Sequence, residues 1–267
     1  MNNELIRELG DTLYGALTER RTIAPLTDSH PDIRIEHAYQ ISLRLLENRL
    51  AAGEKVIGKK IGVTSKAVMD MLNVRQPDFG FMTDAMRHDG EMAISKLLIQ
   101  PRAEGELAFI LKRDLVGPGV TNADVLAATE AVVPCFEVVD SRIHDWKIKI
   151  QDTVADNASC GLFTINESAA IDPRKIDLAT CGMVVTKNDK VISTGAGAAA
   201  MGSPVNCVTW LANTLGQFGI TLNAGDVILS GSLVPLEPVT AGDVMTVRVG
   251  GTTWICLARS KPGQRGL

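Results

Sequence analysis

Short runs of β-forming residues, separated by turn residues, begin at Lys55 and continue almost to the C-terminus, and they restrict the possible folds more than any other feature. Runs of this length and composition are typical of strands. The polar residues 187–190 separate two of them and predict a hairpin. The runs are KVIGKKIGV, GELAFIL, VVPCFEVV, GMVVTK with KVIST, DVILSG and DVMTVRV.

The N-terminal segment has the other periodicity, with apolar residues recurring every three or four positions. This spacing predicts two helices. Two more helices interrupt the strand-like runs, one behind Thr121 as N-cap and one with Ser203 as N-cap and Pro204 at the first helical position. The four predicted helices span residues 4–20, 35–52, 122–131 and 204–218.

No linker, repeat or low-complexity tract divides the 267 residues. We therefore predict a single α+β domain over residues 1–267, mainly β. It comprises a helical N-terminal layer over 1–54, a β-rich catalytic core over 55–258 and a tail over 259–267 that we expect to be disordered.

Composition excludes several classes of function. The net charge is -4, and the sequence contains no basic stripe of the kind that binds a nucleic acid. Neither a signal peptide nor a membrane-length apolar run is present, which predicts a cytoplasmic protein. The five cysteines and four histidines are scattered, without zinc or dithiol spacing. A metal in this protein would therefore be held by oxygen ligands.

Carboxylates occur where apolar residues would be expected. Period-two alternation places Glu104 and Glu106 on one face of a strand whose other residues are apolar on both faces. Glu137 lies within a second apolar run. Converging carboxylates in a low-dielectric pocket repel one another unless a cation compensates, and oxygen ligands suit Mg²⁺ or Mn²⁺. The alternative is an exposed edge strand, with Glu137 paired to Arg102 or Arg142.

Seven segments of the chain resemble the 2-hydroxypentadienoate (2-oxopent-4-enoate) hydratases of aromatic meta-cleavage pathways, which are members of the fumarylacetoacetate-hydrolase-like superfamily. The resemblance extends to about Gly250 and implies a mixed β-sandwich or roll for the core. The tail, LARSKPGQRGL, departs from the family. The segments are IGKKIGVTSKAV, QPDFGFMTDAM, QPRAEGELAFIL, PCFEVVDSRI, DTVADNASCGLF, GSPVNCVTWLAN and AGDVILSGSLV.

The resemblance implies that Glu104, Glu106 and Glu137 bind the metal and that Lys60 and Asp78 are catalytic. The family's G-x-K-x-G pattern selects Lys60, which composition alone would place on the surface. Asp78 stands in Pro-Asp-x-Gly, which is also good turn chemistry. The sister family of 4-oxalocrotonate decarboxylases carries a different residue at this position, so Asp78 favours hydration.

Two serines are weaker candidates for substrate binding. Ser159 falls in the family's D-N-A-S pattern, although the bare sequence is also a polar turn. Ser232 belongs to Ser-Gly-Ser after a predicted strand, where backbone N–H groups could receive a carboxylate; an ordinary strand-ending turn explains it equally well.

The resemblance implies that the protein adds water to 2-hydroxypenta-2,4-dienoate, giving 4-hydroxy-2-oxopentanoate. The alternatives are 4-oxalocrotonate decarboxylation, hydration of a longer dienoate, and a silent partner subunit of the decarboxylase. We also expect a homo-oligomer and a complex with 4-oxalocrotonate decarboxylase. Neither a nucleic acid nor a membrane is an expected partner.

Overall fold

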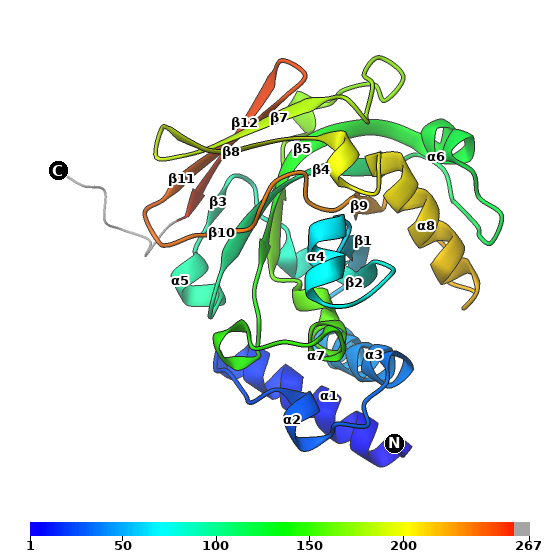
Figure 1. Cartoon of the computed structure of the whole chain (residues 1–267), viewed down its shortest axis with the longest axis vertical. Helices are drawn as coiled ribbons and strands as arrows, with labels where there is room; N and C mark the ends of the chain where they lie inside the picture. The colour runs from blue at the N-terminus through cyan, green and yellow to red at the C-terminus, as the bar shows by residue number, and fades with distance from the viewer. Residues whose placement is uncertain (259–267) are drawn as a thin grey trace.

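The computed structural model describes residues 1–258, which form two β-sheets and a helical layer (Figure 1). The predicted tail at 259–267 lies outside the described residues. The α+β fold class is confirmed. In the described part of the chain, no helix has the length and apolar character needed to cross a membrane.

The larger sheet contains seven strands in the order β2-β1-β9-β4-β5-β6, with β10 pairing with β4. All neighbours along this order are antiparallel except β1 and β9. The strands are β1 (Val56–Gly62), β2 (Asp78–Thr83), β4 (Arg102–Leu111), β5 (Thr129–Val139), β6 (Leu162–Ile165), β9 (Val227–Leu229) and β10 (Glu237–Pro238).

The smaller sheet has the order β3-β12-β11-β7-β8. The predicted hairpin between β7 and β8 is confirmed, and Asn188 and Asp189 both take positive φ angles, as a two-residue turn of this kind requires. The strands are β3 (Glu91–Met92), β7 (Gly182–Lys187), β8 (Lys190–Ala196), β11 (Val244–Val249) and β12 (Thr252–Ala258).

The main apolar core lies between the two sheets. Leu107 and Phe109 of β4 pack in one cluster with Met183 and Val185 of β7. Gly105 permits this approach, because a Cβ atom there would lie 2.8 Å from Met183 Sδ. The next residue, Ala108, belongs to a different cluster on the opposite face of the larger sheet. β4 is therefore buried on both faces, as predicted.

The helical layer lies at one end of the molecule, and α1 packs against α3 and α3 against α7 (Figure 1). α2 also lies in this layer, where it contacts α7, and the remaining helices are dispersed among the strands. The helices are α1 (Asn3–Glu19), α2 (Leu26–Ser29), α3 (Ile35–Ala51), α4 (Lys66–Met71), α5 (Ile94–Leu97), α6 (Asn122–Ala128), α7 (Ile150–Ala155) and α8 (Pro204–Gly216), with 3₁₀ turns η1 (Asp84–Met86), η2 (His144–Trp146), η3 (Asn157–Ser159), η4 (Glu167–Ala169) and η5 (Gly197–Ala199).

Local signals located the helix starts better than the helix ends. Thr121 caps α6 by accepting the Asp124 N–H, as predicted. The helix nevertheless ends at Ala128 and not at residue 131, because Thr129 and Ala131 already pair with β4 in β5. At α8, Pro204 is the first helical residue as predicted, but the Ser203 side chain makes no capping hydrogen bond.

Candidate metal centre and active site

Three glutamates converge on the face of the larger sheet that carries Ala108. Glu104 of β4 lies directly opposite Glu137 of β5 in the antiparallel register. Glu106 follows two residues later, so its side chain leaves the same face. One carboxylate oxygen from each residue lies within 4.8 Å of the other two. The strand pairing brings together carboxylates that are more than thirty positions apart in the sequence.

Two of the three glutamates are fully buried, unlike the carboxylates of a surface acidic cluster. Glu106 and Glu137 are 0% exposed. The Gly231 N–H donates to Glu106 Oε2 at 2.9 Å, whereas Glu106 Oε1 and Glu137 Oε2 have no hydrogen-bond partner within residues 1–258. Buried carboxylate oxygens without a partner are costly. Their arrangement fits an oxygen-liganded Mg²⁺ or Mn²⁺ ion.

The alternative of an exposed edge strand is wrong. β4 lies between β9 and β5, and the guanidinium of Arg142 is paired with Asp156 at 2.5 Å and not with Glu137. The guanidinium of Arg102 lies over the ring of Trp146. Neither arginine therefore neutralises the glutamates.

The glutamates affect one another's protonation. Burial, followed by the charge of Glu137, raises the pKa of Glu104 to about 8. The same two causes raise the pKa of Glu106 well above its usual range. Burial also raises the pKa of Glu137, against the opposing effect of Lys60. A divalent cation among these groups would favour their charged forms.

Adjacent lysines of β1 lie on opposite faces of the sheet. Lys59 pairs with Asp226 at 2.5 Å, whereas Lys60 Nζ lies 3.3 Å from Glu137 Oε1. Lys60 is only 3% exposed, so its expected surface location on composition grounds is wrong. Burial alone would lower the pKa of Lys60, but the charges of Glu137 and Asp78 raise it above its ordinary value. The neighbouring carboxylates therefore favour the cationic form of Lys60.

Asp78 opens β2, opposite Gly62 of β1. Its interpretation as a turn residue is wrong, because Pro77 precedes a strand and Gly80 serves a close approach to the backbone of Asn157. A Cβ atom on Gly62 would overlap Asp78 Oδ1 and lie 3.3 Å from Lys60 Nζ. The two charged groups therefore flank the space that Gly62 leaves open. Burial raises the pKa of Asp78, partly offset by Lys60.

The two candidate serines are engaged in other hydrogen bonds. Ser159 Oγ lies 2.9 Å from Thr153 Oγ1, and Ser232 Oγ donates to the carbonyl of Val234 at 2.5 Å. Their binding to substrate stays a prediction. The carboxylate that meets the backbone of the Ser-Gly-Ser segment is that of Glu106, through Gly231.

Asn157 is a supporting residue that the sequence did not single out. Its side chain accepts from the Phe81 N–H at 2.8 Å and donates to the Phe81 carbonyl at 2.9 Å. It thereby fixes β2 three residues beyond Asp78. Asn157 has a φ of 55°, which Asn tolerates better than most residues. The polar D-N-A-S turn was the visible signal, but its structural partner lies 76 positions away.

Comparison with known proteins places the chain in a family. The sequence profile described as "Fumarylacetoacetate (FAA) hydrolase C-terminal" matches residues 61–257. A protein of Pseudomonas putida named 2-hydroxypent-2,4-dienoate hydratase is 72% identical over 222 residues, covering 82% of this chain and 100% of that protein. The chain belongs to the fumarylacetoacetate hydrolase family.

Two further similar proteins each cover nearly the whole length of this chain. A 2-hydroxyhexa-2,4-dienoate hydratase of Comamonas testosteroni is 59% identical over 94% of this chain and 96% of its own. The solved structure of a 4-oxalocrotonate decarboxylase from Pseudomonas putida G7, complexed with magnesium and adipate, has a TM-score of 0.92 at 33% identity, covering 97% of this chain and 98% of that one.

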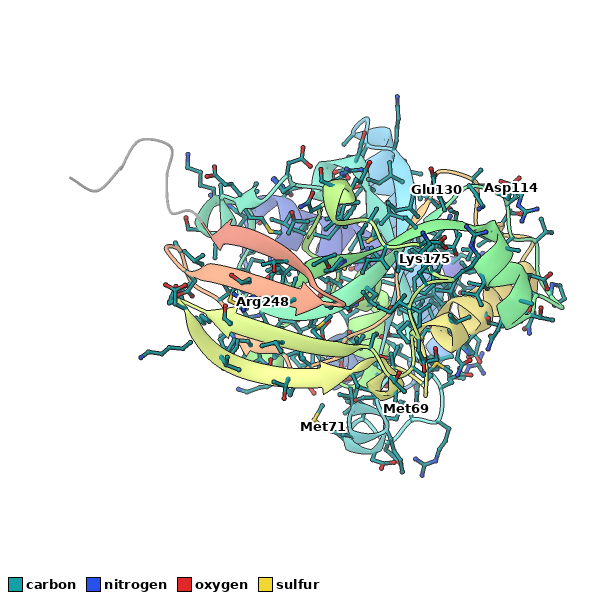
Figure 2. The ribbon with its side chains drawn as sticks, turned by 90° about the horizontal axis from the view of Figure 1, so that it is seen from above. Met69, Met71, Asp114, Glu130, Lys175 and Arg248 are labelled. Atoms are coloured by element: carbon teal, nitrogen blue, oxygen red, sulfur yellow. The ribbon has the colours of Figure 1, made fainter. Side chains whose placement is uncertain are left out.

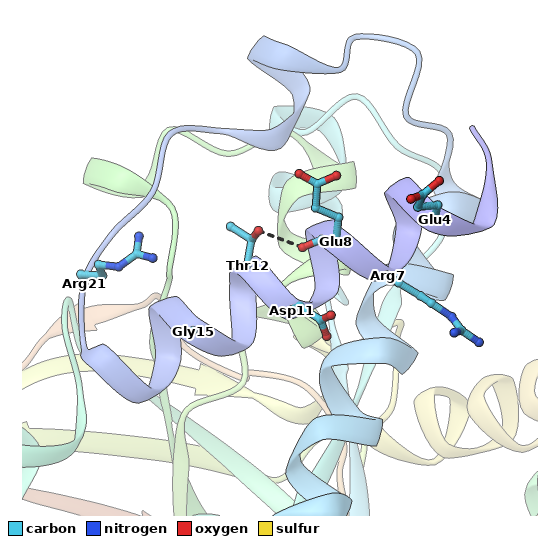
Figure 3. Close-up of a pocket in the computed structure, with 7 residues that line it drawn as sticks. All are labelled: Glu4, Arg7, Glu8, Asp11, Thr12, Gly15 and Arg21. Atoms are coloured by element: carbon cyan, nitrogen blue, oxygen red, sulfur yellow. Dashed lines mark hydrogen bonds between the residues drawn. The ribbon is translucent and has the colours of Figure 1, made fainter.

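The fumarylacetoacetate hydrolase match begins at Ile61 and so leaves most of the helical layer outside it. A shallow depression on that layer follows α1, where the Thr12 hydroxyl donates to the Glu8 carbonyl (Figure 3). Its lining mixes acidic residues with Arg7 and Arg21. The three clustered glutamates and Asp78 fall within the matched range.

Proposed function

We propose that this protein is a metal-dependent hydratase that converts 2-hydroxypenta-2,4-dienoate into 4-hydroxy-2-oxopentanoate during meta-cleavage degradation of aromatic compounds. The observation that carries the proposal is the buried group of three glutamates beside Lys60 and Asp78. The names of the relatives at 72% and 59% identity support the substrate class.

We propose Glu104, Glu106 and Glu137 as the ligands of Mg²⁺ or Mn²⁺. Bound there, the ion would supply Lewis-acid polarisation of the substrate's carboxylate and C2 oxygen. The unpartnered carboxylate oxygens of Glu106 and Glu137 support this assignment. Magnesium in the decarboxylase of similar structure also supports it.

Proton transfer in this reaction balances within the site. The 2-hydroxyl loses a proton and C5 gains one, which gives the conjugated 2-oxo-3-enoate; water then loses a proton as its oxygen bonds to C4, and C3 gains one. The raised pKa of Lys60 favours its cationic form, which suits it to orient anionic oxygens. Burial raises the pKa of the Asp78 carboxyl, which suits it to accept and return a proton.

The first prediction tests the metal site. Glu106→Gln should abolish the Mg²⁺- or Mn²⁺-dependent loss of dienoate ultraviolet absorbance, because a neutral amide is a poor replacement for a carboxylate ligand. The matched control is Glu130→Gln, since Glu130 lies exposed on β5 (Figure 2). Turnover in Glu106→Gln at the rate of the Glu130→Gln control would contradict the proposed site.

Product analysis separates hydration from the second candidate. The TM-score of 0.92 to a 4-oxalocrotonate decarboxylase favours testing decarboxylation directly. We expect 4-hydroxy-2-oxopentanoate from the five-carbon dienoate and no carbon dioxide from 2-oxohex-3-enedioate. Metal-dependent release of carbon dioxide would favour decarboxylation over hydration as the function. Absence of both activities in a correctly folded holoenzyme would support the alternative of a silent subunit.

A further inference from the structure

A pocket opens beside the C-terminal end of β1, between α4 and the segment that precedes α8. Its polar lining includes Thr64, the second residue after β1. Most of its remaining wall is apolar and comes from two separate parts of the chain. The apolar lining residues are Met69, Val74, Ala198, Ala199 and Met201.

This pocket borders the metal site through Thr64. A Cβ atom on Gly231 would overlap the side chain of Thr64, so the two residues are in close contact. The Gly231 N–H donates to Glu106 Oε2 at 2.9 Å. A substrate whose first two carbons lie at the glutamates would therefore have the pocket within reach of its other end.

The backbone around the pocket is held in an unusual conformation. Val63 and Met201 have φ angles of 56° and 49°, although Val63 is β-branched and Met201 is not a glycine. The Met201 N–H donates to the Thr64 carbonyl at 3.2 Å, and the Met201 carbonyl accepts from Asn206 Nδ2 at 2.9 Å. Such strain persists where the surroundings fix it, and it concentrates at ligand sites.

The cations at the pocket are poorly placed to bind a second carboxylate. Lys66 and Arg75 both face Asp70, at 2.7 and 3.5 Å. Their side chains are 87% and 79% exposed, so solvent screens their charges. A carboxylate that entered the apolar wall beside Met69 would lose its hydration without gaining a buried counter-charge.

We infer that Met69 and Met201 are specificity-determining residues that contact the apolar end of a monocarboxylate substrate, and that this pocket disfavours a substrate with a second terminal carboxylate. The inference rests on the proposed function for the position of C1 and C2 at the glutamates. Methionine suits this task because its flexible thioether adapts to tails of different length.

Binding of unreactive 2-oxo acids tests the inference independently of turnover. Isothermal titration of the Mn²⁺-loaded protein would compare pyruvate, 2-oxopentanoate, 2-oxohexanoate and 2-oxoadipate. The wild type should gain about fourfold in affinity for each methylene beyond pyruvate. It should bind 2-oxohexanoate at least about tenfold more tightly than 2-oxoadipate, which has the same length and differs by its charged end.

The variants Met69→Ala and Met201→Ala should each reduce the gain per methylene to under about twofold while leaving pyruvate affinity unchanged. Met71→Ala is the matched control, because Met71 lies on α4 with Met69 but is 73% exposed and does not line the pocket (Figure 2). Met69 and Met201 lie on different segments, so either variant suffices if the other does not fold.

The inference is overturned if both variants keep the wild-type gain, if 2-oxoadipate binds as tightly as 2-oxohexanoate, or if no 2-oxo acid binds. Hydration of 2-hydroxypenta-2,4-dienoate is assayed on the same preparations. Absent hydration with the expected binding series rejects the proposed function and retains the inference. Hydration with a flat binding series does the reverse.

Discussion

The geometry of the site depends on a residue without a side chain as well as on charged residues. Gly62 is flanked by Asp78 Oδ1 and Lys60 Nζ, so the absence of a side chain there permits the two groups to approach. The glutamates were visible in the sequence as charged residues inside apolar runs, whereas Lys60 and Asp78 were selected only by the family resemblance. The sequence did not reveal their distances, which depend on the pairing of β1 with β2.

Gly62→Ala should therefore lower activity without unfolding the protein. The added methyl would displace the Asp78 carboxylate, and a displacement of about 1 Å can cost on the order of 100-fold in rate. Steady-state kinetics of dienoate hydration would measure the loss. Gly182→Ala is the control, since Gly182 also lies in a strand but a Cβ atom there meets nothing within 4 Å. Equal rates for the two variants would contradict this account of Gly62.

His88 provides a prediction on pH. Its Nε2 is buried without a hydrogen-bond partner among the described residues, and burial lowers its pKa below 6.5 despite the nearby Asp89. The pKa of His88 is lower in the folded chain than in the unfolded chain, so the unfolded chain binds more protons at pH values between the two. The contribution of His88 to the free energy of unfolding is therefore complete above pH 6.5 and is lost as the pH falls below it.

Urea unfolding of wild type and His88→Gln between pH 5 and 8 would measure this contribution as a difference. We expect the stability advantage of the wild type to shrink as the pH falls through 6.5. The difference between the two proteins removes the titration of the carboxylates common to both. A difference that is constant with pH, or that grows toward pH 5, would refute the role of His88.

At the scale of elements, the pairing of β4 with β5 could be anticipated only in part. Alternation along β4 predicted both its double burial and the common face of Glu104 and Glu106, and both predictions are confirmed. The register that sets Glu137 opposite Glu104 is a tertiary property. β6 and α7 were not predicted, because four and six residues give too little periodicity to recognise.

Asn157→Ala tests how η3 supports β2. The variant leaves the buried N–H and carbonyl of Phe81 without their side-chain partner, each at a cost of about 1–3 kcal/mol. We expect denaturant unfolding to show a loss in that range or above, together with reduced activity through Asp78. Asn73→Ala is the control, because Asn73 has a similar φ of 53° but is exposed. Equal losses would assign the effect to backbone conformation alone.

At the scale of the whole molecule, the helical layer is connected to the site through aromatic packing. Tyr39 of α3 stacks on Phe79 of β2, with ring centroids 4.4 Å apart, directly beside Asp78. The layer thus supports one wall of the candidate site, although the family match begins after α3. Periodicity predicted both long helices, but nothing in the sequence indicated which strand they would cover.

Several predictions about the whole molecule stay open to experiment. A single domain over residues 1–267, a homo-oligomer, a complex with a 4-oxalocrotonate decarboxylase and a cytoplasmic location are all predictions of this kind.

The neighbouring lysines of β1 have a consequence for how this strand finds its place during folding. If β1 shifted by one residue, Lys59 would take the position of Lys60, so an ammonium group would still meet Glu137. The contact with Glu137 therefore does not reject this misalignment, whereas the buried Asp226 would lose Lys59 and face Gly58. Gly58 also disfavours the shift, because Ile57 in its place would collide with the carbonyl of Val227. Gly58, an uncharged residue two positions before Lys60, thus helps to fix the register that places Lys60 beside Glu137.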